Sequence, residues 1–170
     1  MAIVTTVRGT VASSSNSTSY TTSAFTPTAG EMLTAFFEFN EPTGVVSVTD
    51  TLGGSWTQKI ALDRTGGTGF CYCYVRNSAV SATSMTVSFR DSVGALGCNG
   101  MVFSQTGTDG VGSATVVQVK SANNSGTSAP AVTFDSTTVT TNATLGAVFC
   151  NDNPAGATPP TNWTEGSDIG

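Results

Sequence analysis

The sequence contains no histidine. Without an imidazole, a Ser-His-Asp or Cys-His arrangement cannot form within the chain, and acid–base catalysis would depend on carboxylates. Eleven Asp and Glu residues are present, but Glu38 is the only glutamate at the centre of a predicted strand. Its predicted neighbours in the sheet are not acidic, so we do not expect the facing pair of carboxylates that a glycosidase uses. We therefore predict that the chain is not an enzyme, with no catalytic residue and no cofactor.

Charged residues are also scarce. They make up 10% of the chain, against about 25% in a typical globular protein. The six basic residues are scattered along the sequence. No basic patch can be drawn from them, so binding to nucleic acid through its phosphates is not expected. The formal net charge of -5 mainly favours solubility.

Long apolar runs are missing as well. No stretch approaches the roughly 18 apolar residues that suggest a membrane-spanning helix, so we expect no membrane partner. The opening residues Met-Ala-Ile-Val-Thr-Thr show neither the basic region nor the apolar region of a signal peptide. We therefore expect the protein to be made in a cytoplasm.

Cysteine is limited to four residues, Cys71, Cys73, Cys98 and Cys150. A small secreted domain held by disulfides would usually be shorter and richer in cysteine. Cys71 and Cys73 are two positions apart on a predicted strand, so their side chains point to the same face. Without histidine, a zinc site would need all four thiolates at an unfavourable spacing. We expect small, buried, free thiols and no metal site, and disulfides are the alternative.

The residues that are abundant favour strands. Ser, Thr, Gly, Ala and Val dominate, whereas helix formers such as Leu, Lys, Glu and Arg are few. Turn signals recur about every 8–14 residues, the spacing of a sandwich or barrel. We predict an all-β, antiparallel, jelly-roll-like β-sandwich with ten to eleven short strands and little or no helix, in a single domain over residues 1–170. The expected strands are 3–11, 20–25, 32–39, 45–51, 56–62, 69–75, 85–89, 98–104, 114–119, 131–134 with 137–140, and 145–150.

The stretch 45–75 is the predicted centre of the fold. It contains three strands joined by the turns 52–55 and 65–68, each of which holds a Gly-Gly pair. Because glycine takes a positive φ at little cost, we expect tight hairpins and a three-stranded meander. The segment 91–97 is expected to be a loop.

Residues 32–39 are the best candidate for a central strand. Their alternation places Leu33, Ala35, Phe37 and Phe39 on one face. Because this face is wholly apolar, we expect it to pack on a second sheet.

Aromatic side chains offer the main candidate ligand contacts. A β-sandwich can present exposed aromatic rings on which sugars stack, and the candidate ligand-facing residues are Trp56, Tyr72, Tyr74 and Trp163. Trp56 directly follows a glycine turn, so it could lie at a rim, although a core position is favoured. A carbohydrate-binding or adhesin module that recognises surface glycans is the alternative function.

A short pattern occurs twice. Gly-Ser-Trp-Thr at 54–57 is echoed by Thr-Asn-Trp-Thr at 161–164, and the sequence ends six residues later. After the first copy we predict a strand, a glycine turn and an aromatic strand. The echo therefore predicts a domain incomplete at its C-terminus, with a further strand beyond Gly170 or one supplied by a neighbour.

These motifs support a resemblance over most of the chain. The Ser/Thr-rich opening, the stretch Phe-Thr-Pro-Thr-Ala-Gly-Glu-Met-Leu at 25–33 and the paired Trp-Thr turns resemble Ser/Thr-rich, jelly-roll-like β-sandwich virion structural proteins of tailed bacteriophages. The resemblance implies a capsid decoration (cement) protein, head fibre or tail-associated module made in the host cytoplasm. Its partners would be capsid or other virion proteins. It brings no catalytic residue.

The same interpretation predicts how the chain would associate. The N-terminal strand 3–11, or an unpaired edge at the other terminus, could add to a neighbouring sheet. We therefore expect a homo-oligomer or strand exchange with a neighbour.

Overall fold

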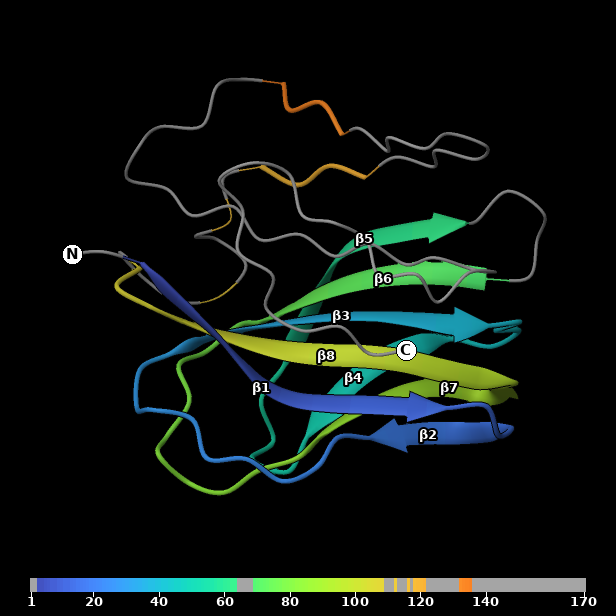
Figure 1. Ribbon diagram of the computed structural model, residues 1–170, viewed down its shortest axis with the longest axis horizontal. Coiled ribbons are helices and arrows are strands. Elements are labelled where there is room, and N and C mark those ends of the chain that lie inside the picture. Colours follow the sequence, from blue (N-terminus) through green and yellow to red (C-terminus); the bar gives the residue numbers. More distant parts are fainter. Residues whose placement is uncertain are drawn as a thin grey trace.

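A computed structural model describes residues 3–63, 69–108, 112, 116, 118–121 and 132–135, and these contain strands but no helix (Figure 1). The predicted all-β, antiparallel sandwich is confirmed. No helix long and apolar enough to cross a membrane is found in these ranges. The strands are β1 (Val4–Ser13), β2 (Ser17–Thr21), β3 (Met32–Asn40), β4 (Val46–Asp50), β5 (Trp56–Asp63), β6 (Gly69–Arg76), β7 (Val87–Ala95) and β8 (Gly97–Thr106).

The described part of the chain thus holds eight of the ten to eleven strands expected. The strands predicted at 137–140 and 145–150 lie outside the described residues. Within the segments 114–119 and 131–134, the residues that are described do not belong to a strand.

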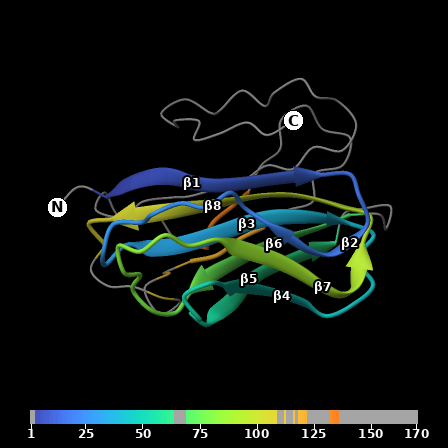
Figure 2. The same ribbon diagram turned by 90° about the horizontal axis from the view of Figure 1, so that it is seen from below.

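The strands form two sheets, one with the order β1-β8-β3-β6-β5 and one with the order β2-β7-β4 (Figures 1 and 2). The pairs β1·β8, β2·β7 and β3·β6 are those of one long antiparallel ribbon rolled on itself, which is the jelly-roll arrangement. A regular roll would place β5 beside β4. Here β5 pairs with β6 instead, at the edge of the larger sheet.

The core lies between the two sheets. On β3, Leu33, Ala35, Phe37 and Phe39 are fully buried, which confirms that this apolar face meets a second sheet. The ring of Phe37 stacks on that of Phe89 from β7, with 4.5 Å between ring centroids and 11° between planes. Burial of such large rings supplies much of the stability of a sandwich.

The three-stranded meander predicted at 45–75 is wrong in its first half. β4 belongs to the smaller sheet and β5 to the larger one, so residues 51–55 cross between sheets instead of closing a hairpin. Gly53 takes a positive φ of 72°, whereas Gly54 is needed for space, because a Cβ there would lie 2.2 Å from Arg76 Nε. The second half is confirmed: β5 and β6 pair antiparallel, and the turn between them lies outside the described residues.

The loop expected at 91–97 is also wrong, because β7 continues to Ala95. Asp91, which looks like a turn residue in the sequence, is fully buried in this strand. At the other end, β7 starts at Val87, and Met85 forms only an isolated bridge with Phe25.

No disulfide joins the three cysteines that the structure describes. Cys73 and Cys98 are buried and Cys71 is half-buried, so the small-hydrophobe interpretation is confirmed for the first two. Cys150 lies outside the described residues. Cys73 packs on the outer face of the larger sheet, in a second apolar cluster with Phe36, Met101 and Phe103.

Candidate binding surface at one end of the sandwich

The candidate aromatic residues do not form an exposed platform. Tyr72 and Tyr74 are 7% and 5% exposed, and their rings stack on Phe37 in the core. Burial raises the pKa of Tyr72 to about 12 and also raises that of Tyr74. Trp56 is half-buried against the core and donates its indole N–H to Asp50. Trp163 lies outside the described residues. The burial of Tyr72 and Tyr74 leaves neither ring open to a sugar.

Asp50 is the centre of a buried polar cluster at the crossing from β4 to β5. Its side chain is fully buried, and Oδ2 accepts hydrogen bonds from Trp56 Nε1 at 2.8 Å and from Arg76 Nε at 2.9 Å. Oδ1 accepts from the backbone N–H groups of Leu52 and Gly54. Burial alone would raise the pKa of Asp50, but the hydrogen bonds from Arg76, Gly54 and Trp56 outweigh it and lower the pKa. Both oxygens therefore hold the chain crossing in place.

A second internal ion pair joins Arg8 of β1 to Glu31, which precedes β3. The Arg8 guanidinium also donates to Ser104 Oγ at 2.7 Å, and Glu31 accepts from the N–H of Thr28 at 2.9 Å. Burial would raise the pKa of Glu31, but these donors more than compensate and lower it. Like Asp50, this carboxylate serves the fold.

Three segments gather at the opposite end of the sandwich, to which the tips of β1 and β3 point on the right of Figure 1. Two are the loops 14–16 and 41–45, and the third is residues 92–96, which comprise the end of β7 and Leu96. Asp91 fixes the last two of these segments. Its Oδ1 accepts from the N–H groups of Val93 at 2.8 Å and Gly94 at 3.0 Å, and its Oδ2 accepts from Gly44 at 3.2 Å. Burial would raise the pKa of Asp91, but these backbone donors outweigh it and lower the pKa.

Tyr20 fixes the remaining loop, residues 14–16. Its hydroxyl oxygen lies 2.8 Å from the Ser15 carbonyl oxygen and 2.5 Å from that of Ala95, and it accepts from the N–H of Ser17 at 3.1 Å. One phenol thus connects residues 14–16 to the end of β7. Burial raises the pKa of Tyr20, so the hydroxyl stays protonated and able to donate.

These fixed segments expose aliphatic side chains. Val45 is 75% exposed, Val93 68% and Leu96 41%. Both backbone polar groups of Val45 are bonded to Ser92. The Val45 N–H donates to Ser92 Oγ, and the Val45 carbonyl accepts from the Ser92 N–H. The N–H of Leu96 donates to Asn40 at the end of β3. We call Val45, Val93 and Leu96 the aliphatic tip.

The aliphatic tip was missed by sequence reasoning, which placed Val45 inside a strand and residues 91–97 in a loop without a role. One signal could have pointed to it. Pro-Thr-Gly-Val at 42–45 and Asp-Ser-Val-Gly at 91–94 both place a valine beside a glycine within turn-forming residues. Apolar residues in turns are unusual enough to raise the question of a partner.

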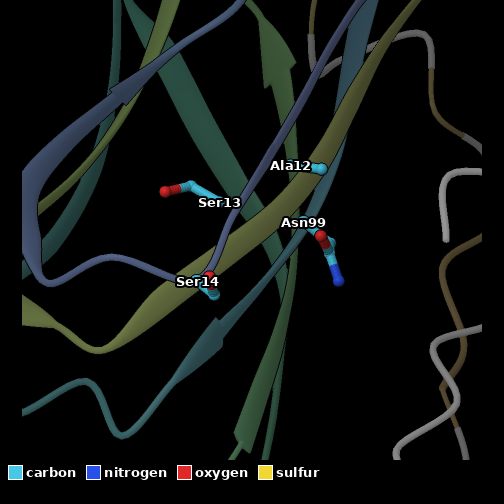
Figure 3. Close-up of a pocket in the computed structure, with 4 residues that line it drawn as sticks. All are labelled: Ala12, Ser13, Ser14 and Asn99. Atoms are coloured by element: carbon cyan, nitrogen blue, oxygen red, sulfur yellow. The ribbon is translucent and has the colours of Figure 1, made fainter.

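A hollow of about 390 Å³ lies nearby, lined by Ala12, Ser13, Ser14 and Asn99 (Figure 3). The side chains of Ala12 and Asn99 point to one side of the ribbons, and that of Ser13 points to the other side. The lining offers hydroxyl and amide groups and no titratable side chain, so it can form hydrogen bonds but cannot move protons. Across the described ranges, no group of three or more Cys, Asp or Glu side chains is placed to hold a metal ion.

No family model, curated protein or solved structure matches the chain. Function is therefore inferred from the residues and their geometry alone.

Proposed function

We propose that the chain is a non-enzymatic structural protein of a bacteriophage virion, made in the host cytoplasm. It is a capsid decoration protein, head fibre or tail-associated module that acts by protein–protein binding. The observation that carries this proposal is the aliphatic tip: Val45 just before β4 and Val93 near the end of β7 are largely exposed on backbone fixed by a fully buried carboxylate. Exposed apolar groups on a rigid scaffold are typical of a binding surface.

The state of the carboxylates supports a structural role. Asp50, Asp91 and Glu31 are each buried and each accept several hydrogen bonds from the protein. Their pKa values are lowered, so they are ionised at neutral pH and already paired. A general acid needs the reverse, a raised pKa next to an open cleft.

The strand order supports the same class of role. Double-sheet jelly rolls are used by viral capsid proteins and by lectins. Such a fold suits a rigid module present in many copies on a particle, although a fold alone does not select one role. Many weak contacts made at once give tight attachment without a large interface in any one copy.

Binding of a surface glycan is the second candidate function. The hollow beside Ser14 and Asn99 favours it, since hydroxyl and amide groups are suitable partners for sugar hydroxyls. A glycan array probed with a multivalent form of the protein tests this alternative. Absence of signal at high avidity would remove it.

Association with particles tests the first proposal. Phage particles that encode the chain are purified on a density gradient, and copies per particle are counted by quantitative mass spectrometry. We expect a fixed ratio of the chain to the major capsid or tail protein. If the chain stays in the soluble fraction of infected cells and is missing from purified particles, the proposal is wrong.

A further inference from the structure

We propose that the aliphatic tip is the surface that docks on the particle, and that its site there is an apolar protein surface with a basic rim on a different protein. This inference rests on the proposed virion function and goes further by naming the surface and the chemistry of its partner. It places attachment at the loop end of the sandwich and not at the edges of its sheets.

The edges of the larger sheet are poor sites for adding a strand. Among the described strands, β1 and β5 form these edges, and each has a register shift at a basic residue: Arg8 between Val7 and Gly9, and Lys59 between Gln58 and Ile60. A bulge breaks the regular row of N–H and C=O groups that an added strand needs. A basic residue at such a bulge discourages pairing further.

The edges of the smaller sheet are interrupted too. On β4, the carbonyl of Val46 lies 3.1 Å from the Tyr74 hydroxyl, which comes from the other sheet. On β2, the pairing with β7 shifts between Ser17 and Ser19. Strand addition would have to displace these contacts, whereas the aliphatic tip is free to bind as it stands.

The aliphatic tip is ordered before it binds. Asp91 holds the backbone at Gly44, Val93 and Gly94, and a Cβ at Gly44 would lie 2.3 Å from Asp91 Oδ1. Tyr20 connects the neighbouring loop to Ala95. Segments fixed in this way lose little conformational entropy on binding, so a small apolar contact becomes effective.

Charge selects the partner. The three segments 14–16, 41–45 and 92–96 contain no Lys or Arg, and their one exposed carboxylate is Glu41, held at a positive φ of 48° beside β3. The whole chain carries a formal charge of -5. A symmetric contact between two copies through this end would bring two Glu41 carboxylates together, which is unfavourable. A different protein with an apolar centre and a basic rim complements both features.

The size of the surface predicts how it binds. Three aliphatic side chains cover only part of the roughly 800 Å² per partner that a stable one-to-one complex buries. One copy therefore binds weakly, and attachment depends on several copies or on repeated sites on the particle.

The test uses particles that lack the chain and full-length purified protein added back, with binding measured by co-sedimentation. The variants are Val45→Asp and Val93→Asp in the aliphatic tip, and the matched control is Val4→Asp. Val4 is 56% exposed at the start of β1, at the other end of the sandwich. All three valines are on the surface, so we expect unfolding midpoints close to that of the unaltered protein.

We expect each tip variant to lower the apparent affinity by about tenfold or more, since a buried unpaired charge costs at least that much, and Val4→Asp to bind normally. Glu41→Lys should also weaken binding; stronger binding would mean an acidic partner and overturn the basic rim.

If the unaltered protein binds and the tip variants bind equally well, the tip is not the docking surface, while the virion function stands. If the unaltered protein does not bind, the virion function itself fails. If it forms dimers in sedimentation analysis that Val45→Asp dissociates, the tip binds a second copy and the partner is wrong.

Discussion

Gly100 of β8 lies directly beneath the ring of Phe89. A Cβ at this position would lie 2.3 Å from Phe89 Cε2 and 2.9 Å from the Cβ of Phe37. The missing side chain leaves room for the Phe37–Phe89 stack, which joins the two sheets at the middle of the core. The distance between the two sheets at this point therefore leaves room for a glycine at position 100 of β8 and not for a larger residue.

Gly100→Ala should destabilise the protein by about 1–3 kcal/mol, since an added methyl group forces the ring and backbone apart in a packed core. Urea unfolding followed by tryptophan fluorescence measures the change. Asn99→Ala is the control, because Asn99 is the exposed neighbour on the same strand. Equal midpoints for the two variants would show that the core tolerates the methyl group.

Asp50→Ala should cost about 3–5 kcal/mol, because it leaves the Arg76 guanidinium buried without its carboxylate. Replacing both residues, as in Asp50→Ala with Arg76→Leu, should recover part of the loss. Glu41→Ala removes an exposed carboxylate and serves as the control. A neutral Asp50→Ala variant in chemical denaturation would contradict the role of this pair in holding the crossing from β4 to β5.

Acid should destabilise the fold. The pKa values of Asp50, Asp91 and Glu31 are lowered in the folded protein. Their contribution is therefore fully present above the ordinary carboxyl range of about 3.9–4.3 and is lost as pH falls through the lower folded values. Urea midpoints measured from pH 7 to pH 2 should be level at first and then fall below about pH 4. Asp91→Asn should show a shallower fall, and stability that rises on acidification would refute this account.

Cys73 and Cys98 should resist alkylation in the folded protein. Burial raises the pKa of the Cys73 thiol to about 12 and raises that of Cys98 as well, so neither reactive thiolate forms near neutral pH. Cys71 is half-buried and should react first. Timed iodoacetamide labelling with peptide mass spectrometry measures the order, and labelling in denaturant provides the control. Early labelling of Cys98 would show that the core opens more readily than its packing suggests.

Local patterns allowed much of the fold to be predicted. The alternation at Leu33, Ala35, Phe37 and Phe39 identified the central strand and the face that meets the second sheet, because burial on one face imposes a period of two. The crossing at 51–55 could not be predicted in this way. It depends on Asp50 and Arg76, which are 26 residues apart, and the Gly-Gly pair beside them also fits a hairpin.

The candidate binding surface was less accessible to sequence reasoning. An aromatic side chain such as Tyr72 or Tyr74 suits either a core or a ligand site. Only the burial of these two rings in the structure shows that they belong to the core. Val45 fits a strand pattern, yet it precedes β4 and its side chain faces solvent. Asp91 looks like a loop residue, although burial and backbone donors make it the anchor of the aliphatic tip.

The bulges at Arg8 and Lys59 also matter while the protein accumulates in a cell. A flat ten-residue edge such as β1 would otherwise act as a template on which identical chains stack into fibres. Because the pairing register of both outer strands of the larger sheet shifts at a basic residue, we expect these two edges to be poor templates for stacking copies of the chain.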